Sequence, residues 1–173
     1  MRVHVVSVPH TGTHFTLEVL RRSGVRWERR IHTTQEGWQD SFAPGVRVVV
    51  PMRLLALVVA SALNRGEPVR ISDFNEIAKL RTSDTHFFRV DCEDADRRAE
   101  LDKLGDFLDC DMADVDWAPL NSRKDVLDLK GKCDVIDQLY SRAVSGAEIQ
   151  AVLGELGYKT LSRSDCGCGE VAA

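Results

Sequence analysis

The chain has 173 residues, of which 43% are hydrophobic and 29% are charged, with 23 Lys and Arg against 27 Asp and Glu. This length suits one domain with its own core, the hydrophobic share excludes intrinsic disorder, and a net charge of −4 argues against a nucleic-acid partner. No stretch approaches the roughly 18–20 apolar residues of a membrane span, no signal peptide is recognisable, and five cysteines do not suit a disulfide framework, so we expect a cytoplasmic protein without a membrane partner.

Runs of β-branched residues alternate with amphipathic segments along the chain. In chain order they predict a strand over 2–8, a helix over 11–22, a strand over 46–50, a buried helix over 54–63, a helix over 73–81, a strand over 86–91, and helices over 94–108, 129–143 and 146–156. This alternation is typical of an α/β fold with three layers and a mainly parallel central sheet. Without a repeat or a linker in the sequence, we expect a single domain over residues 1–161 and a flexible tail over 162–173.

The first strand runs directly into a glycine turn of the kind that binds tetrahedral anions. The turn reads Pro9-His10-Thr11-Gly12-Thr13-His14-Phe15. The unpaired N–H groups and the dipole at the start of the following helix attract an anion, Gly12 allows close approach, and the threonine hydroxyls and histidines can donate hydrogen bonds. The alternative is an ordinary strand-to-helix turn in which Thr11 caps the helix.

Two features of a nucleoside-triphosphate P-loop are missing from the sequence. The turn lacks the GxxxxGK[ST] spacing and has no Lys after the glycine. The strand over 46–50 also lacks the terminal Asp that holds magnesium in such enzymes. A P-loop-like phosphotransferase is therefore the least favoured alternative.

Several segments together resemble the cytosolic-type sulfotransferases, which use 3′-phosphoadenosine 5′-phosphosulfate (PAPS). The glycine turn is similar to the family's Pro-Lys-Ser-Gly-Thr-Thr-Trp loop, with His10 in place of the basic residue. Arg53 and Ser61 have the eight-residue spacing of the family's 3′-phosphate ligands, although the residues between them differ from the family pattern. Residues 87–94 with Phe107-Leu108 are similar to the family's strand and helix that follow, and Arg123-Lys124 resembles part of its final basic segment.

The resemblance implies a P-loop-NTPase-like, compact member of that family that moves a sulfuryl group from PAPS to the hydroxyl of a small molecule or glycan, in line and without a metal. It implies that His32, in the context Ile31-His32-Thr33-Thr34, is the general base and that protonated His10 stabilises the leaving nucleotide. The residues that it implies for binding PAPS are His10, Thr11, Gly12, Thr13, His14, Phe15, Arg53, Ser61, Arg123 and Lys124.

Other interpretations of these residues stay open. The domain can be a module that binds PAPS or adenosine 3′,5′-bisphosphate with little or no turnover. His32 can be a loop residue, Arg53 a charge at the start of a helix, Ser61 a packing residue, and Arg123-Lys124 solvated surface. His10 and His14 have the spacing of a metal pair, but no third ligand is indicated, so we expect no metal.

Three remaining patterns carry weaker hypotheses. Cys92 and Arg98 have the spacing of a tyrosine-phosphatase loop, but the acidic residues between them would repel a phosphate dianion. Cys166 and Cys168 can supply two metal ligands, but the sequence offers no second pair beside them. A disordered tail is therefore favoured over a metal site. The aromatic residues at positions 38 and 42 can cover an acceptor or simply pack beneath their loop.

Overall fold

The computed structural model describes residues 1–68, 70, 72–92, 94–117 and 147–157. The chain divides into two compact units, one containing residues 1–53 with 80–117 and the other containing residues 54–79 with 147–157. The predicted helix over 129–143 and the predicted tail over 162–173 lie outside the described residues. The single domain over 1–161 stays a prediction.

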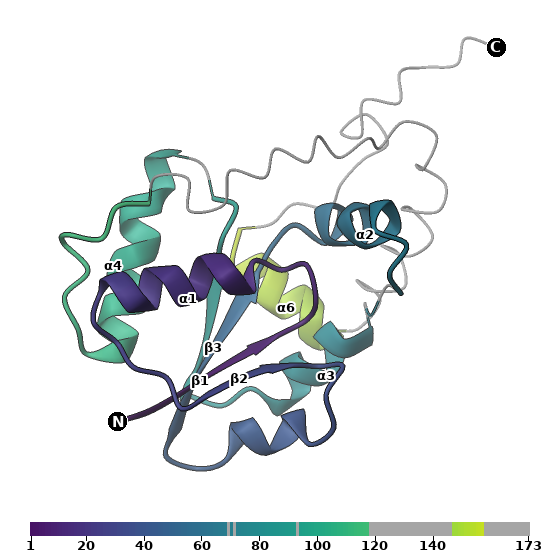
Figure 1. Ribbon diagram of the computed structural model, residues 1–173, viewed down its shortest axis with the longest axis horizontal. Helices are drawn as coiled ribbons and strands as arrows, with labels where there is room; N and C mark the ends of the chain where they lie inside the picture. The colour runs from purple at the N-terminus through teal and green to yellow at the C-terminus, as the bar shows by residue number, and fades with distance from the viewer. Residues whose placement is uncertain (69, 71, 93, 118–146, 158–173) are drawn as a thin grey trace, which may run out of the picture. The chain divides into compact units, whose positions relative to one another are not determined.

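The first unit is built on a four-stranded sheet in which every neighbouring pair of strands is parallel. The spatial order is β2-β1-β3-β4 (Figure 1). The strands are β1 (Arg2–Ser7), β2 (Arg29–His32), β3 (Val46–Met52) and β4 (Thr85–Arg89). The α/β fold with a parallel sheet is therefore confirmed, but the sequence did not predict β2.

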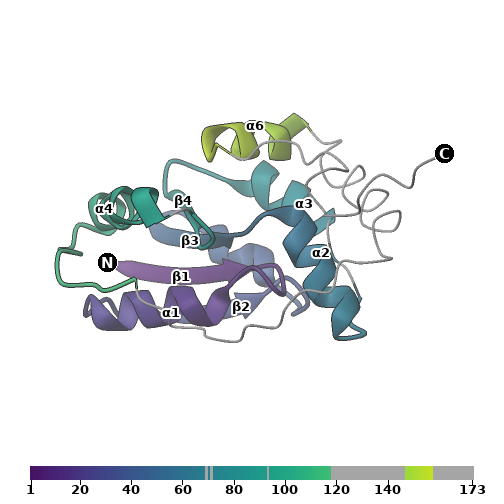
Figure 2. The same cartoon turned by 90° about the horizontal axis from the view of Figure 1, so that it is seen from above.

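Two helices of the first unit, α1 (Thr13–Arg22) and α4 (Arg97–Leu108), share a hydrophobic core with one face of this sheet (Figure 2). From the sheet, Val3, Val5, Val49 and Phe88 enter this core. From the helices and the segment after α4, the members include Phe15, Val19, Leu20, Leu101, Leu104, Leu108 and Trp117. The Trp117 ring lies 4.8 Å from the Phe15 ring and 5.6 Å from the Phe88 ring, so it joins α1 to the sheet beside the start of the helix.

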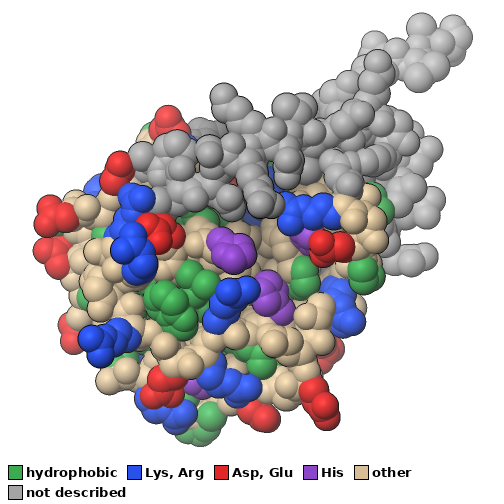
Figure 3. Space-filling model, viewed as in Figure 1, with side chains coloured by type: hydrophobic (Ala, Val, Ile, Leu, Met, Phe, Trp, Pro, Cys, Tyr) green, Lys and Arg blue, Asp and Glu red, His purple; other side chains and the backbone are tan. Residues whose placement is uncertain are grey.

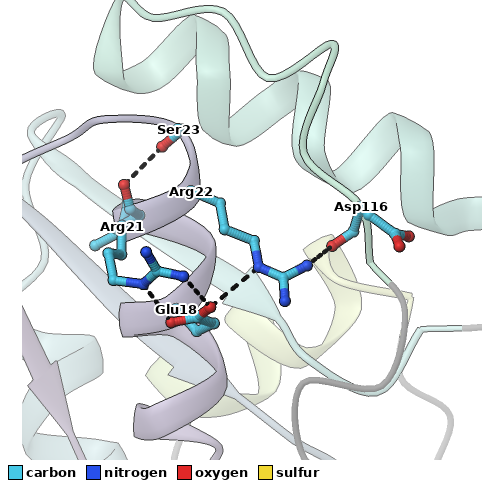
Figure 4. A network of polar contacts seen from close by, with 6 residues as sticks. Glu18, Arg21, Arg22, Ser23 and Asp116 are labelled. Carbon is cyan, nitrogen blue, oxygen red and sulfur yellow. Dashed lines mark hydrogen bonds and ion pairs between the residues drawn. The ribbon is translucent and has the colours of Figure 1, made fainter.

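The outer side of α1 is tied to the same segment by polar contacts (Figure 4). Arg22 donates to the carbonyl oxygen of Asp116 at 3.3 Å and to the Glu18 carboxylate at 3.1 Å. Arg21 donates to both Glu18 oxygens, and the hydrogen bonds from the two arginines lower the pKa of Glu18 to about 2. These groups are largely exposed, so their ion pairs contribute little to stability and mainly orient the segment at Asp116.

Element boundaries differ from the predicted ones at two informative places. Helix α1 begins at Thr13 and not at Thr11, because Gly12 takes the N-cap position. Strand β3 continues through Pro51 to Met52, beyond the last position paired with β1, because β4 still pairs with both residues. The shorter segments η1 (Trp38–Phe42) and η2 (Asp94–Asp96) are 3₁₀ helices, and Trp38 is buried, so it packs and does not offer an exposed surface.

The second unit contains α2 (Leu55–Asn64), α3 (Ser72–Leu80) and α6 (Ala147–Glu155). Each helix has buried apolar side chains, and the predicted burial of the segment over 54–63 is confirmed at Leu55, Val58 and Val59. In the part of the chain that the structure describes, no helix has the length and apolar character needed to cross a bilayer.

Candidate functional site

All four strands of the sheet are parallel, so their carboxyl ends lie along one edge. In open α/β sheets, ligands bind outside this edge, where the loops after the strands meet. Here the edge carries the turn after β1, the end of β2 at His32 and the residue after β3, Arg53. Three regions that the sequence singled out are therefore brought to the same edge of one compact unit.

The turn between β1 and α1 is held in a conformation that few residues adopt. Gly12 has φ +99°, and His10 has φ +72°, in the left-handed region that L-residues other than glycine seldom occupy. Such a backbone conformation costs roughly 1–3 kcal/mol at a non-glycine residue and concentrates at functional sites. The backbone conformation at His10 makes this turn a candidate functional site.

The first turn of α1 keeps its backbone donors available. Thr11 does not cap the helix, as one interpretation of the sequence required, because its hydroxyl donates to the carbonyl oxygen of Val8 at 2.8 Å. Gly12 stands at the N-cap with no side-chain cap hydrogen bond. Among the described residues, no acceptor is found for the N–H groups of Thr13, His14 and Phe15. These three donors and the positive end of the helix dipole suit a tetrahedral anion.

A chain of side-chain contacts runs from this turn to β2. The Thr13 hydroxyl donates to Oγ of Ser7 at 2.8 Å, and Oγ of Ser7 lies 3.5 Å from Nδ1 of His32. Ser7 and His32 are paired in register as the last residues of β1 and β2. Ser7 is fully buried, so its polar hydrogen must find its partner within this group.

Ser7 is the functional candidate that the sequence analysis missed. The signal in the sequence was a residue with a hydroxyl group at the end of a strand of β-branched residues, directly before a glycine turn.

The surroundings of His32 favour its neutral form. The ring is half-buried, and burial is the largest cause that lowers its pKa, followed by the positive charges of Arg30, His14 and His10. The neutral form of His32 is therefore favoured beside the positive charge of Arg30. Histidine and Lys or Arg side chains are seen close together on the face of the molecule in Figure 3. A neutral imidazole next to cations that attract an anion is suited to exchange protons beside a bound anion.

Arg53 follows β3 directly and is half-buried. The carbonyl of the preceding residue, Met52, accepts a hydrogen bond from Val90 at 2.9 Å, and the Val90 side chain lies against Gly12. Met52, the residue before Arg53, is thus connected to the glycine turn through one intervening residue, Val90. Ser61 is buried on α2, in the other unit, and Arg123 and Lys124 lie outside the described residues.

The phosphatase-like pattern does not form a reactive site. Cys92 is buried, and burial, followed by the Glu100 carboxylate, raises the pKa of its thiol to about 11. Arg98 donates to the Asp102 carboxylate at 2.8 Å and to the carbonyl oxygen of Met112 at 2.9 Å. A thiol nucleophile requires the opposite shift and an available guanidinium, so this hypothesis is rejected.

Within the described ranges, no group of three or more His, Cys, Asp or Glu residues is arranged to hold a metal ion. No family model, curated protein or solved structure matches the chain.

Proposed function

We propose that this protein binds PAPS at the carboxyl edge of its sheet and transfers the sulfuryl group to a hydroxyl acceptor. The observation that carries the proposal is that three groups lie along one edge of the sheet. The uncapped start of α1 follows β1, His32 ends β2 and Arg53 follows β3, and these three strands are neighbours in the sheet. Sulfuryl transfer requires in-line placement and neutralisation of charge on the leaving group, and these groups supply both.

Each residue takes a role from its position. The N–H groups of Thr13, His14 and Phe15 hold the 5′-phosphosulfate, with Gly12 allowing close approach. His10, when protonated, neutralises charge on the oxygen that leaves with adenosine 3′,5′-bisphosphate. Arg53 binds the 3′-phosphate.

His32 receives the proton in the transfer step. The acceptor oxygen forms a bond to sulfur while the bond from sulfur to the bridging oxygen breaks, and the hydroxyl proton passes to a ring nitrogen of His32. A lowered pKa leaves this imidazole unprotonated at neutral pH and so able to accept the proton.

A second candidate is a module that binds PAPS or the bisphosphate and turns it over slowly. The observation in its favour is His10, which carries a full positive charge only when protonated, at the position where the resembling family has Lys or Arg. The two candidates share the binding site and differ only in turnover.

Thermal-shift measurements with adenosine 3′,5′-bisphosphate test the binding site. We expect clear stabilisation by the bisphosphate and none by ATP with magnesium. An Arg53→Gln variant is expected to weaken binding about tenfold or more, since a charge-assisted hydrogen bond contributes about 1.5–3 kcal/mol. The matched control is Arg26→Gln. Arg26 is exposed and precedes β2, so it lies near the amino ends of the strands, opposite the carboxyl edge. Equal affinity in both variants would remove Arg53 from the site.

Transfer from sulfur-labelled PAPS to a panel of sugars, phenols and tyrosine peptides then separates enzyme from module. An enzyme transfers label, and its His32→Ala variant loses transfer while it still binds the bisphosphate. A protein that binds the bisphosphate and transfers nothing across the panel is the module.

A further inference from the structure

We propose that Ser7 is a positioning residue that couples the anion-binding turn to His32, so that Nε2 of His32 is a hydrogen-bond donor while the turn is empty and a proton acceptor once an anion is bound. The inference rests on the proposed function, which supplies the anion. It is carried by the contacts from Thr13 to Ser7 and from Ser7 to His32, at 2.8 Å and 3.5 Å.

The hydrogen count of the free protein fixes its arrangement. The Thr13 hydroxyl donates to Ser7, so the single hydrogen of the Ser7 hydroxyl needs another acceptor. Among the described residues, the side chain of Ser7 contacts no other polar group than Thr13 and His32. Because Ser7 is fully buried, water cannot serve, and Nδ1 of His32 is left as the acceptor. A neutral imidazole that accepts at Nδ1 carries its proton on Nε2.

An anion in the turn reverses each of these hydrogen bonds. Thr13 is the first residue of α1, beside the free N–H groups, so its hydroxyl turns to donate to an anion oxygen. The Thr13 oxygen can then accept from Ser7, and the Ser7 oxygen accepts from Nδ1–H of His32. The heavy atoms keep their places, and the imidazole exchanges one proton at Nε2 for one at Nδ1 through the water that reaches its exposed side.

The reversed arrangement is the one that catalysis requires. Nε2 now carries a lone pair, and it takes the proton of the acceptor hydroxyl as the new oxygen–sulfur bond forms and the bond to the bisphosphate breaks. The product is a doubly protonated imidazole whose Nδ1–H remains bound to Ser7. The base therefore forms only when the sulfuryl donor occupies the turn.

Nitrogen-15 NMR of histidine-labelled full-length protein tests this hydrogen-bond relay from Thr13 through Ser7 to His32, because it reports which ring nitrogen of a histidine is protonated. The His32 signal is identified by its loss in a His32→Gln variant. We expect the Nε2–H form in the free protein and a change to the Nδ1–H form when adenosine 3′,5′-bisphosphate is added.

Three variants separate positioning from simple packing. Thr13→Ser retains the hydroxyl and is expected to preserve the ligand-dependent change, whereas Thr13→Val retains the shape without the hydroxyl and is expected to abolish it. Ser7→Ala is expected to give a mixture of both His32 forms in the free protein. An Nδ1–H form in the free parent protein, or an unchanged His32 spectrum in Ser7→Ala, would overturn the proposal.

The failure of the relay and the failure of the proposed function give different results. If the bisphosphate produces no thermal shift, the proposed function is wrong and the ligand-dependent half of the relay falls with it, while the free-protein spectra still decide whether Ser7 sets the His32 form. If the bisphosphate binds and the His32 form does not change, the site stands and the relay is wrong.

Discussion

A side chain on Gly12 would place its Cβ 2.7 Å from Cγ2 of Val90, the residue that follows β4. The backbone N–H of Val90 also donates to Met52, the last residue of β3. The glycine turn is thus fitted against the ends of two strands. An added Cβ at Gly12 therefore requires the turn or the Val90 side chain to move.

We expect Gly12→Ala to lower stability and to abolish binding of the bisphosphate. The matched control is Gly24→Ala, because Gly24 also has a positive φ, at +73°, but no atom lies within 4 Å of the position of its Cβ. The control is expected to cost only the backbone strain, about 1–2 kcal/mol, and to retain binding. Urea unfolding and thermal shift measure both quantities.

A double variant identifies the cause of the Gly12 effect. Val90→Ala removes the methyl groups nearest to the new Cβ, so Gly12→Ala combined with Val90→Ala should recover part of the stability that Gly12→Ala loses. Equal stability losses for Gly12→Ala and Gly24→Ala would show that the contact with Val90 does not matter.

The sequence predicted the alternation of strands and helices because burial imposes a regular pattern. Strands β1 and β3 consist mainly of β-branched residues that are buried on both faces, so their runs were recognisable. Strand β2 was missed because its sequence is Arg-Arg-Ile-His, with only Ile31 buried. It lies at the edge of the sheet and joins it through backbone pairing with β1, which leaves little trace in the sequence.

The candidate site was only partly predictable for a related reason. His32 was singled out by its spacing, but its position beside Ser7 depends on β2, which the sequence did not reveal. Likewise, the sequence analysis expected the hydroxyls of both Thr11 and Thr13 to donate to an anion, but in the fold they have different acceptors. Thr11 donates to Val8 and stabilises the turn, whereas Thr13 donates to Ser7, the residue that contacts His32 of β2. Side-chain partners across strands require a register, and sequence spacing does not supply one.

The transfer rate should depend on the charge at Arg30. Burial, then Arg30, His14 and His10, lower the pKa of His32, so its neutral, basic form persists to a lower pH than in a free histidine. In the proposed enzyme, kcat/KM therefore falls only as the pH drops through this lowered pKa. Removing one repelling cation raises the pKa, so Arg30→Gln should move the acidic limb of the pH profile to higher pH.

Arg29→Gln is the matched control for Arg30→Gln. Arg29 is exposed on the same strand and is not among the charged groups that shift the pKa of His32. Its variant should keep the acidic limb of the parent protein. An Arg30→Gln profile that coincides with the parent would mean that His32 is not the group that titrates in the rate.

The Cys92 thiol should be inert in the folded protein. Its side chain is buried, and burial together with Glu100 raises its pKa to about 11, so almost no thiolate is present near neutral pH. Peptide mass spectrometry after brief iodoacetamide treatment should find Cys92 unmodified in native protein and modified after denaturation. Fast native alkylation of Cys92 would reopen the phosphatase-like interpretation.

Acid should destabilise the first unit through His86. This side chain of β4 stacks on Phe107 of α4 with ring centres 5.2 Å apart, and its buried Nε2 has no hydrogen-bond partner among the described residues. Burial, with a smaller contribution from Lys103, lowers its pKa from 6.5 to about 4. Because the unfolded chain then binds the proton at a higher pH than the folded chain does, stability is full above about pH 6.5 and decreases as the pH falls toward 4.

The lowered pKa corresponds to a loss of about 3 kcal/mol over that range, at 1.36 kcal/mol for each pH unit. His86→Phe keeps the ring stack and removes the titrating group, so urea unfolding at about pH 7 and pH 4.5 should show a much smaller difference than in the parent. Some pH dependence should remain, because the pKa of His32 is lowered as well. If His86→Phe loses as much stability in acid as the parent does, the folded protein admits a proton at His86 without penalty.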